Sequence, residues 1–351
     1  MSNDAAPRIL ICRMGTLGDT VLTMPIACAL REKFPNAHLT WLVEKKSGSL
    51  IREHRTLDHV LQLEAGWSDS WSSIRQTARM IRSHDFDVMI DCEGTTLTGF
   101  LGWHASIPQR IGFARPHSSF LNRCFNNEQI TSVFDHLTDR SLELLIPLGV
   151  HSPRVRWHLP IPAAARTWAR SWTRQSPTPK LALLSPGSDL SSEHWDATNF
   201  AKLACHLRTT YRYRCLLCWK TDAERSFANR IVEQAHNSAS LAPHTDLPHL
   251  AALLEQSDLF ISGDLEPLHV SVAVGTPTIN LHATATSRSC GTYRQLTLQS
   301  HNDHDAARHA SDIKPHSPLS RKKIISHAIT FERVCEAVSE IETKQRLLRA
   351  S

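Results

Sequence analysis

Long apolar runs are missing from this 351-residue chain, which contains no stretch of eighteen or more apolar residues. A helix that spans a bilayer needs about 20 such residues, so the sequence predicts no membrane span. The start of the chain also lacks a basic segment followed by a long apolar stretch, because the run Ile9–Cys12 is only strand-sized and is followed by Arg13. This pattern predicts no signal peptide and a cytoplasmic location.

A disulfide framework and a cysteine-based metal site are missing too. The nine cysteines are an odd number scattered over a long chain, as expected for reduced thiols. Cys215 and Cys218 have CxxC spacing, but no second CxxC or nearby Cys/His pair completes a tetrahedral metal site. We interpret both as structural thiols, with metal or redox chemistry as the less favoured alternative, and we predict no metal site and no cofactor.

Dense basic clusters with interleaved aromatic residues, which are typical of nucleic-acid-binding proteins, are also missing. The net charge is +5, from 39 Lys and Arg against 34 Asp and Glu. This mild basic excess suits an acidic small ligand or an anionic membrane surface. It predicts no nucleic-acid partner.

What the sequence does contain is a regular alternation of strand-like apolar runs and helical patterns. In the first half we predict strands at Arg8–Cys12, His38–Val43 and Phe86–Asp91, and a helix over Thr20–Phe34. The pattern restarts in the second half with strand Lys180–Ser185, helix Asp196–Thr209, strand Cys215–Cys218, helix Leu247–Gln256, strand Asp258–Ile261 and helix Leu268–Val274. Such alternation predicts parallel sheets built from βαβ units. The sequence therefore predicts an α/β fold with two Rossmann-like, doubly wound domains facing one another across a cleft.

Chain length also favours two domains, because it exceeds the size at which one core stops growing. The proline-rich segment Pro147–Pro179 is the predicted linker. We place an N-terminal domain at 1–165 and a C-terminal domain at 176–330. A final helix at 331–351 could pack back on the N-terminal domain.

The linker contains a basic stripe, since Arg166, Arg170 and Arg174 are spaced i, i+4 and i+8 on one helix face. Trp168 and Trp172 lie on another face. The favoured interpretation is a solvated arginine face with packed tryptophans. The alternative is a peripheral contact with the inner face of the inner membrane, because Arg and Trp suit the headgroup region.

Three turns carry residues suited to chemistry. The first follows strand Arg8–Cys12 and contains Arg13, Gly15, Gly18 and Asp19. Glycines let the backbone approach a ligand, and a helix N-terminus offers free N–H groups. Taken alone, Asp19 is more simply a helix cap, although a carboxylate in a cleft also suits a general base.

The other two turns follow strands of the second half. The residues singled out in them are Ser185, Gly187, Ser188 and His194 after one strand, and Asp264, Leu265, Glu266, Pro267 and His269 after the other. The second group enters a helix, whose N-terminus favours an anion.

These three segments, in this order, resemble glycosyltransferase family 9, the lipopolysaccharide heptosyltransferases, and the resemblance extends from about residue 8 to 340. It implies a GT-B-type, inverting, metal-independent glycosyltransferase. It also implies a nucleotide-sugar donor, ADP-heptose in this family, and a lipid-linked saccharide acceptor on a lipopolysaccharide core or related envelope glycan.

The resemblance also assigns roles. Asp19 is implied to be the catalytic base, with Arg13, Gly18 and Arg110 on the acceptor side. The donor diphosphate is implied to bind Ser185, Gly187, Ser188, His194, Asp264, Leu265, Glu266, Pro267 and His269.

Three positions depart from the family pattern. Glu266 stands where glycine is usual, Glu193 lies where a basic residue is expected, and Leu265 replaces a hydroxyl residue. Glu266 would either repel the diphosphate or accept hydroxyls of an unusual sugar. The alternative function is therefore a catalytically impaired or non-enzymatic binding or assembly protein that keeps the fold.

Overall fold

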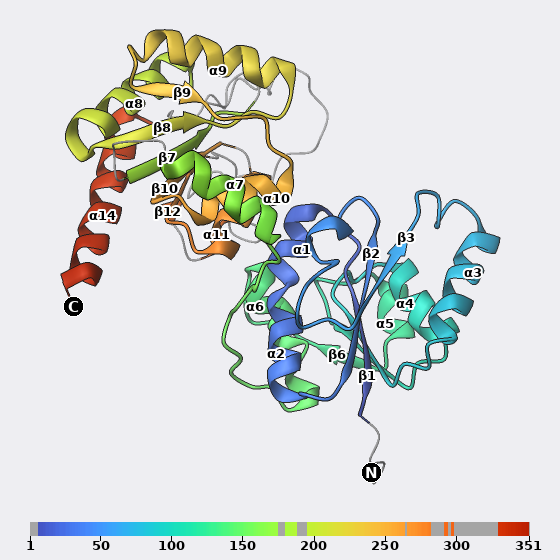
Figure 1. Cartoon of the computed structure of the whole chain (residues 1–351). Helices are drawn as coiled ribbons and strands as arrows, with labels where there is room; N and C mark the ends of the chain where they lie inside the picture. Colours follow the sequence, from blue (N-terminus) through green and yellow to red (C-terminus); the bar gives the residue numbers. More distant parts are fainter. Residues whose placement is uncertain are drawn as a thin grey trace, which may run out of the picture. The chain divides into compact units, whose positions relative to one another are not determined.

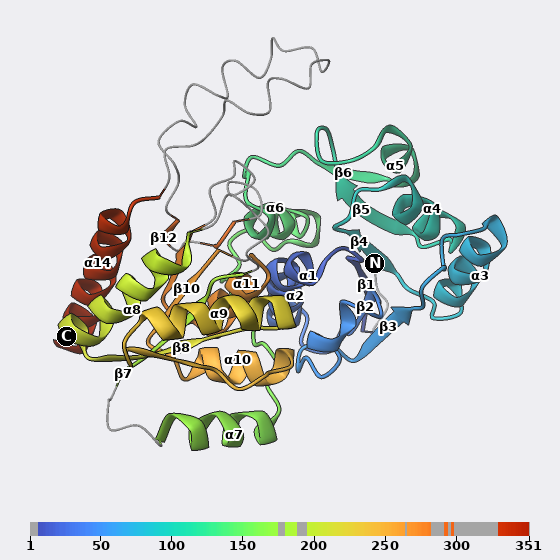
Figure 2. The same cartoon turned by 90° about the horizontal axis from the view of Figure 1, so that it is seen from above.

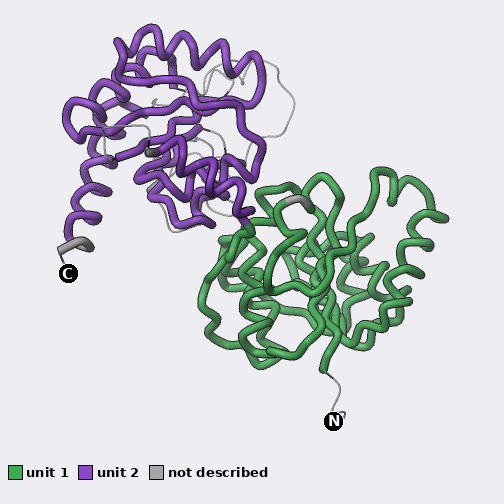
Figure 3. Tube along the Cα trace, in the orientation of Figure 1, with its two compact units in different colours: residues 1–160 green, residues 161–351 purple. Residues whose placement is uncertain are grey.

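The computed structural model describes residues 6–174, 180–187, 195–263, 265–281, 291–293, 296–297 and 329–350. The chain divides into two compact units, Met1–Pro160 and Ile161–Ser351 (Figure 3). Within the described ranges, no helix is both long and apolar enough to cross a membrane.

Unit 1 is built on a parallel sheet with the strand order β3-β2-β1-β4-β5-β6 (Figure 1 and Figure 2). Its strands are β1 (Arg8–Cys12), β2 (His38–Glu44), β3 (His59–Leu63), β4 (Val88–Asp91), β5 (Gln109–Phe113) and β6 (Glu128–Ile130). The central strands are almost wholly buried, because helices cover both faces of a parallel sheet.

The helices of unit 1 form two layers around this sheet. They are α1 (Leu17–Thr23), α2 (Pro25–Lys33), α3 (Trp71–Arg82), α4 (Thr96–His104), α5 (Phe120–Phe125) and α6 (Leu137–Glu143), with short 3-10 turns at η1 (Gly48–Leu50) and η2 (Ile146–Leu148). Helices α3, α4 and α5 lie side by side on one face, and α1, α2 and α6 lie on the other (Figure 2).

The prediction of a single helix over Thr20–Phe34 is wrong, because the structure has two consecutive helices there. Helix α1 ends at Thr23, and α2 begins at Pro25, with Met24 as the shared cap. Proline has no backbone N–H and fits the first position of a helix, so a new helix begins there.

Unit 2 repeats the architecture of unit 1. Its strands are β7 (Lys180–Ser185), β8 (Tyr213–Leu217), β9 (Ala239–Leu241), β10 (Leu259–Ser262), β11 (Thr278–Asn280) and β12 (Leu296–Thr297), in the parallel order β12-β11-β10-β7-β8-β9. Its helices are α7 (Ala163–Arg174), α8 (Ala197–Tyr211), α9 (Asp222–Gln234), α10 (Leu247–Glu255), α11 (Leu265–Val274) and α14 (Phe331–Ala350).

The last helix, α14, is an integral part of unit 2. Val334, Val338 and Ile341 enter the hydrophobic core of that unit. The buried carboxylate of Glu342 accepts hydrogen bonds of 2.6 Å from Lys180 and of 2.6 Å from Tyr213. These contacts join α14 to strands β7 and β8.

Both sheets have the strand order of a doubly wound fold, in which the chain reverses direction across the sheet at one point. This point is called the switch point of the sheet. In unit 1 the switch point lies between β1 and β4, and in unit 2 it lies between β7 and β10. Ligands of such folds bind beyond the carboxyl ends of these strands. The predicted α/β, doubly wound class is therefore confirmed, and the fold itself indicates where to look for a site in each unit.

Candidate functional site

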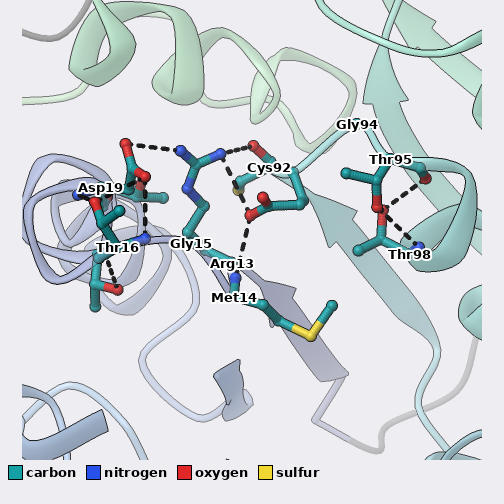
Figure 4. A network of polar contacts seen from close by, with 12 residues as sticks. Arg13, Met14, Gly15, Thr16, Asp19, Cys92, Gly94, Thr95 and Thr98 are labelled. Carbon is teal, nitrogen blue, oxygen red and sulfur yellow. Dashed lines mark hydrogen bonds and ion pairs between the residues drawn. The ribbon is translucent and has the colours of Figure 1, made fainter. Parts of the chain in front are cut away.

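At the switch point of unit 1, the turns after β1 and β4 bring two carboxylates to one arginine (Figure 4). Nη2 of Arg13 lies 3.0 Å from Oδ1 of Asp19, and Nη1 lies 3.5 Å from Oε2 of Glu93. Nη1 also donates to the carbonyl of Cys92 at 2.7 Å. We call Arg13, Asp19 and Glu93 the carboxylate cluster.

The cluster is partly shielded from water. The Arg13 side chain is 11% exposed, against 23% for Asp19 and 20% for Glu93. Burial by itself would lower the pKa of Arg13, but the carboxylates of Glu93 and Asp19 outweigh burial and raise it. Arg13 is therefore a permanent cation that holds both carboxylates in place.

Asp19 is also a cap of helix α1. Its Oδ2 accepts hydrogen bonds from the backbone N–H of Thr16 at 3.1 Å and from the Thr16 hydroxyl at 2.9 Å. The Thr16 hydroxyl in turn accepts from the Asp19 N–H, which completes a capping box. A Cβ on Gly15 would lie 2.7 Å from Oδ2 of Asp19, so a side chain at position 15 would displace this carboxylate.

The second turn of the cluster is fixed by Asp91, which is fully buried at the end of β4. Its Oδ1 accepts from the N–H groups of Glu93 and Gly94, both at 3.1 Å. Its Oδ2 accepts from Thr98, Asn122 and Asn126. Gly94 has φ 71°, and a Cβ there would lie 2.4 Å from the His117 carbonyl. Asp91 therefore fixes the turn that holds Glu93 beside Arg13.

At the switch point of unit 2, β7 and β10 end side by side. The Ser185 carbonyl accepts from the Ser262 hydroxyl at 3.1 Å and from the Gly263 N–H at 3.3 Å. Gly187 turns the chain away from β7 with φ 76°. Helix α11 begins at Leu265, three residues after the last residue of β10.

Glu266 lies in the first turn of α11 and has a cationic neighbour. Nζ of Lys220 lies 3.2 Å from Oε2 of Glu266, and the two side chains are 74% and 42% exposed. Lys220 follows β8, the strand next to β7. The negative charge of Glu266 at this helix N-terminus is therefore partly balanced by Lys220, although an ion pair this exposed to solvent contributes little to stability.

The structure places most of the predicted site residues in these two groups. Pro267 and the buried His269 belong to α11, and the buried Gly18 lies in the first turn of α1. Ser188, Glu193, His194 and Asp264 lie outside the described residues, as does the side chain of Leu265.

Arg110 is not part of the carboxylate cluster. Its guanidinium donates to the carbonyls of Ile107 and Phe125, which ties the start of β5 to the end of α5. Two other residues, Glu93 and Lys220, were missed by the sequence analysis. The only signal for either was its position after a predicted strand.

The CxxC pair lies at the end of β8, where burial raises the pKa of Cys215 to about 12 and that of Cys218 to about 12. Thiols with such pKa values stay protonated near neutral pH, so they are poor metal ligands and nucleophiles. This environment supports the interpretation as structural thiols.

Two Rossmann-type sheets, each with polar residues gathered at its switch point, define the class of protein: the chain has the GT-B fold. Residues 74–317 match glycosyltransferase family 9 (heptosyltransferase), and the chain belongs to that family.

Relatives and solved structures agree with this assignment. The lipopolysaccharide core heptosyltransferase OpsX of Haemophilus influenzae is 22% identical over 80% of each chain. The crystal structure of a family 9 glycosyl transferase from Veillonella parvula has a TM-score of 0.77 at 22% identity and covers 96% of this chain and 97% of that one. Escherichia coli heptosyltransferase WaaC with ADP-2-deoxy-2-fluoro heptose has a TM-score of 0.66 at 18% identity and covers 84% of this chain and 93% of that one.

Proposed function

We propose that this protein transfers a heptose from ADP-heptose to a saccharide of a lipopolysaccharide core or a related envelope glycan, with inversion and without a metal ion. One observation carries the proposal: the predicted base lies at the switch point of one sheet, and predicted donor residues lie at the switch point of the other. The solved relative with a heptose-bearing ADP ligand, and the relatives that act on lipopolysaccharide, support the choice of substrates.

In this mechanism Asp19 takes the proton from the acceptor hydroxyl. A carboxylate offers about four acceptor positions. The Thr16 N–H, the Thr16 hydroxyl and Arg13 use three of them, so Asp19 can still accept from an acceptor hydroxyl. The deprotonated oxygen attacks the anomeric carbon from the face opposite the diphosphate. The bond from that carbon to the diphosphate breaks, and ADP leaves.

The donor diphosphate would bind at the N-terminus of α11, beside Gly263 and the end of β7. Backbone N–H groups and the helix dipole stabilise a developing negative charge there. Lys220, which lies beside Glu266, adds a cation within reach of the same helix end. Among the described residues of this helix end, Glu266 carries a charge that opposes the anion.

Isothermal titration calorimetry with ADP-heptose, ADP, UDP-glucose and GDP-mannose tests the proposal. We expect ADP-heptose to bind more tightly than the UDP and GDP sugars. Asp19→Asn serves as the matched control, because its change lies in unit 1 and should leave donor affinity unaltered. If no nucleotide sugar binds at about 1 mM, the transferase proposal fails, and the non-enzymatic binding or assembly protein is the better account.

A further inference from the structure

Three neighbouring helices of unit 1, α3, α4 and α5, expose an unusual concentration of large apolar side chains. Trp71 is 63% exposed, Trp103 51%, Phe120 67% and Leu121 49%. Scattered single residues of this kind are common on protein surfaces, but contiguous groups of them mark interaction sites.

The exposed residues form one continuous surface around Phe100 of α4. Its ring centroid lies 5.4 Å from Trp71, 5.9 Å from Trp103 and 5.8 Å from Phe125. Leu121 precedes Phe125 by one helical turn on α5, so it extends the same face. Phe120 adjoins this face through Arg123, whose Cζ lies 5.7 Å from the centroid of the Phe120 ring. We call Trp71, Phe100, Trp103, Phe120, Leu121 and Phe125 the aromatic surface.

The helices that carry this surface have charges of one sign only, and the exposed Asp69 lies two residues before α3 begins. Every charged residue on the three helices is an arginine: Arg75, Arg79, Arg82 and Arg123. On α3, Trp71 and the first three arginines are spaced i, i+4, i+8 and i+11, which places them on one exposed stripe. The opposite face of α3, with Ile74 and Ile81, is buried in the core. The stripe therefore runs beside the aromatic surface.

We propose that the aromatic surface and its arginines dock the protein on an anionic phospholipid bilayer. Tryptophan and phenylalanine insert at the boundary between headgroups and acyl chains, while arginines bind the phosphates above it. Charge complementarity selects this occupant, because the helices offer an anionic surface four arginines and no carboxylate. The inference does not depend on which sugar the protein transfers.

The basic stripe of α7 is less suited to that role. Arg166 forms two hydrogen bonds of 2.8 Å with Glu255, and Trp168 packs edge-on against His249 at 4.8 Å between ring centroids. Arg166 of the stripe and the nearby Trp168 are thus already engaged within unit 2, and the packing of Trp168 agrees with the favoured sequence interpretation. Among the ion pairs of the described residues, none joins an arginine of the exposed α3 stripe to a carboxylate.

Vesicle sedimentation of the full chain tests the proposal. Wild type should bind vesicles of phosphatidylcholine with 30% phosphatidylglycerol at least about tenfold more tightly than pure phosphatidylcholine, and the difference should shrink with salt. The triple variant Arg75→Gln, Arg79→Gln, Arg82→Gln should lose about ten- to a hundredfold in affinity for the anionic vesicles. The matched control is Lys202→Gln, Arg225→Gln, Arg230→Gln, which removes the same charge from exposed positions of unit 2 and should bind like wild type.

A second variant separates insertion from charge. Brominated phosphatidylcholine quenches tryptophan fluorescence on contact, and the variant Trp71→Phe, Trp103→Phe should lose most of the quenching seen in wild type. Circular dichroism melts verify that each variant is folded.

Equal binding of wild type and the α3 triple variant would overturn the proposal. So would concentration-dependent self-association that both tryptophan substitutions abolish without any vesicle binding, because a second copy would then cover the surface.

Discussion

Arg13 and Asp19 flank the turn after β1, and their side chains meet in an ion pair of 3.0 Å between Nη2 and Oδ1. The same aspartate closes the capping box of α1 through Thr16. The cap and the proposed base are therefore one residue, and the two interpretations of Asp19 in the sequence do not exclude each other. Only a measurement of activity separates them, because both predict some loss of stability when Asp19 is changed.

Arg13→Met should destabilise unit 1 by about 2–4 kcal/mol, because it leaves two partly buried carboxylates near each other without a cation. Urea unfolding followed by circular dichroism measures the change. The control is Arg52→Met, since Arg52 donates a solvent-exposed hydrogen bond of 3.0 Å to Gln62, and this variant should lose less than about 0.5 kcal/mol. Equal losses in both variants would show that the carboxylate cluster is not held by Arg13.

Glu266→Gly should tighten binding of ADP-heptose a few-fold and at most about tenfold, because it removes a carboxylate from the N-terminus of α11. The gain is modest because Lys220 already offsets that charge. Lys220→Met alone should weaken donor binding, and in the Glu266→Gly background it should reverse the gain. Calorimetric titration of all four proteins measures these effects.

The competing account of Glu266 predicts a different pattern. If Glu266 accepts hydroxyls of the donor sugar, Glu266→Gly weakens binding of ADP-heptose and leaves the binding of free ADP unchanged. Titrating both ligands against wild type and Glu266→Gly therefore distinguishes repulsion from sugar recognition.

His54 makes the stability of unit 1 depend on pH. Its Nε2 donates to the Trp157 carbonyl at 2.6 Å, and its Nδ1 accepts from the Thr56 hydroxyl at 2.8 Å, so the neutral ring satisfies both contacts. Burial lowers the pKa of His54, although the bond to Trp157 opposes this. The unfolded chain, with a pKa of about 6.5, therefore binds the proton more readily.

The stability that His54 contributes is present above about pH 6.5 and is lost as the pH falls below that value. The melting temperature of wild type should decline between pH 7.5 and pH 5 more steeply than that of His54→Gln. His151→Gln, at an exposed position, should keep the wild-type dependence. Parallel curves for wild type and His54→Gln would contradict this role.

Much of the fold was predictable because the central strands are continuous, strand-sized apolar runs. The predicted strands Arg8–Cys12 and Lys180–Ser185 match β1 and β7 residue for residue. The edge strands β3 and β6 were missed, because they are half-exposed and mix polar with apolar residues. A continuous apolar run identifies a strand buried on both faces, whereas an edge strand carries no such signature.

The candidate site was predictable in position but not in its contacts. The turns after β1, β7 and β10 were identified because doubly wound folds bind ligands at strand ends. The pairing of Arg13 with Glu93 and of Lys220 with Glu266 could not be predicted, because each joins residues that only the order of strands brings together. No local pattern in the sequence encodes such long-range neighbours.

Transfer of heptose by wild type and Asp19→Asn, followed by mass spectrometry of the product, tests the central claim most directly. A positioned general base typically accelerates a reaction about a hundredfold or more, so Asp19→Asn should lose at least about that factor in turnover. Calorimetry should show unchanged affinity for ADP-heptose, and circular dichroism should show a folded variant. Wild-type turnover in folded, donor-binding Asp19→Asn would reduce Asp19 to a helix cap and contradict the proposed mechanism.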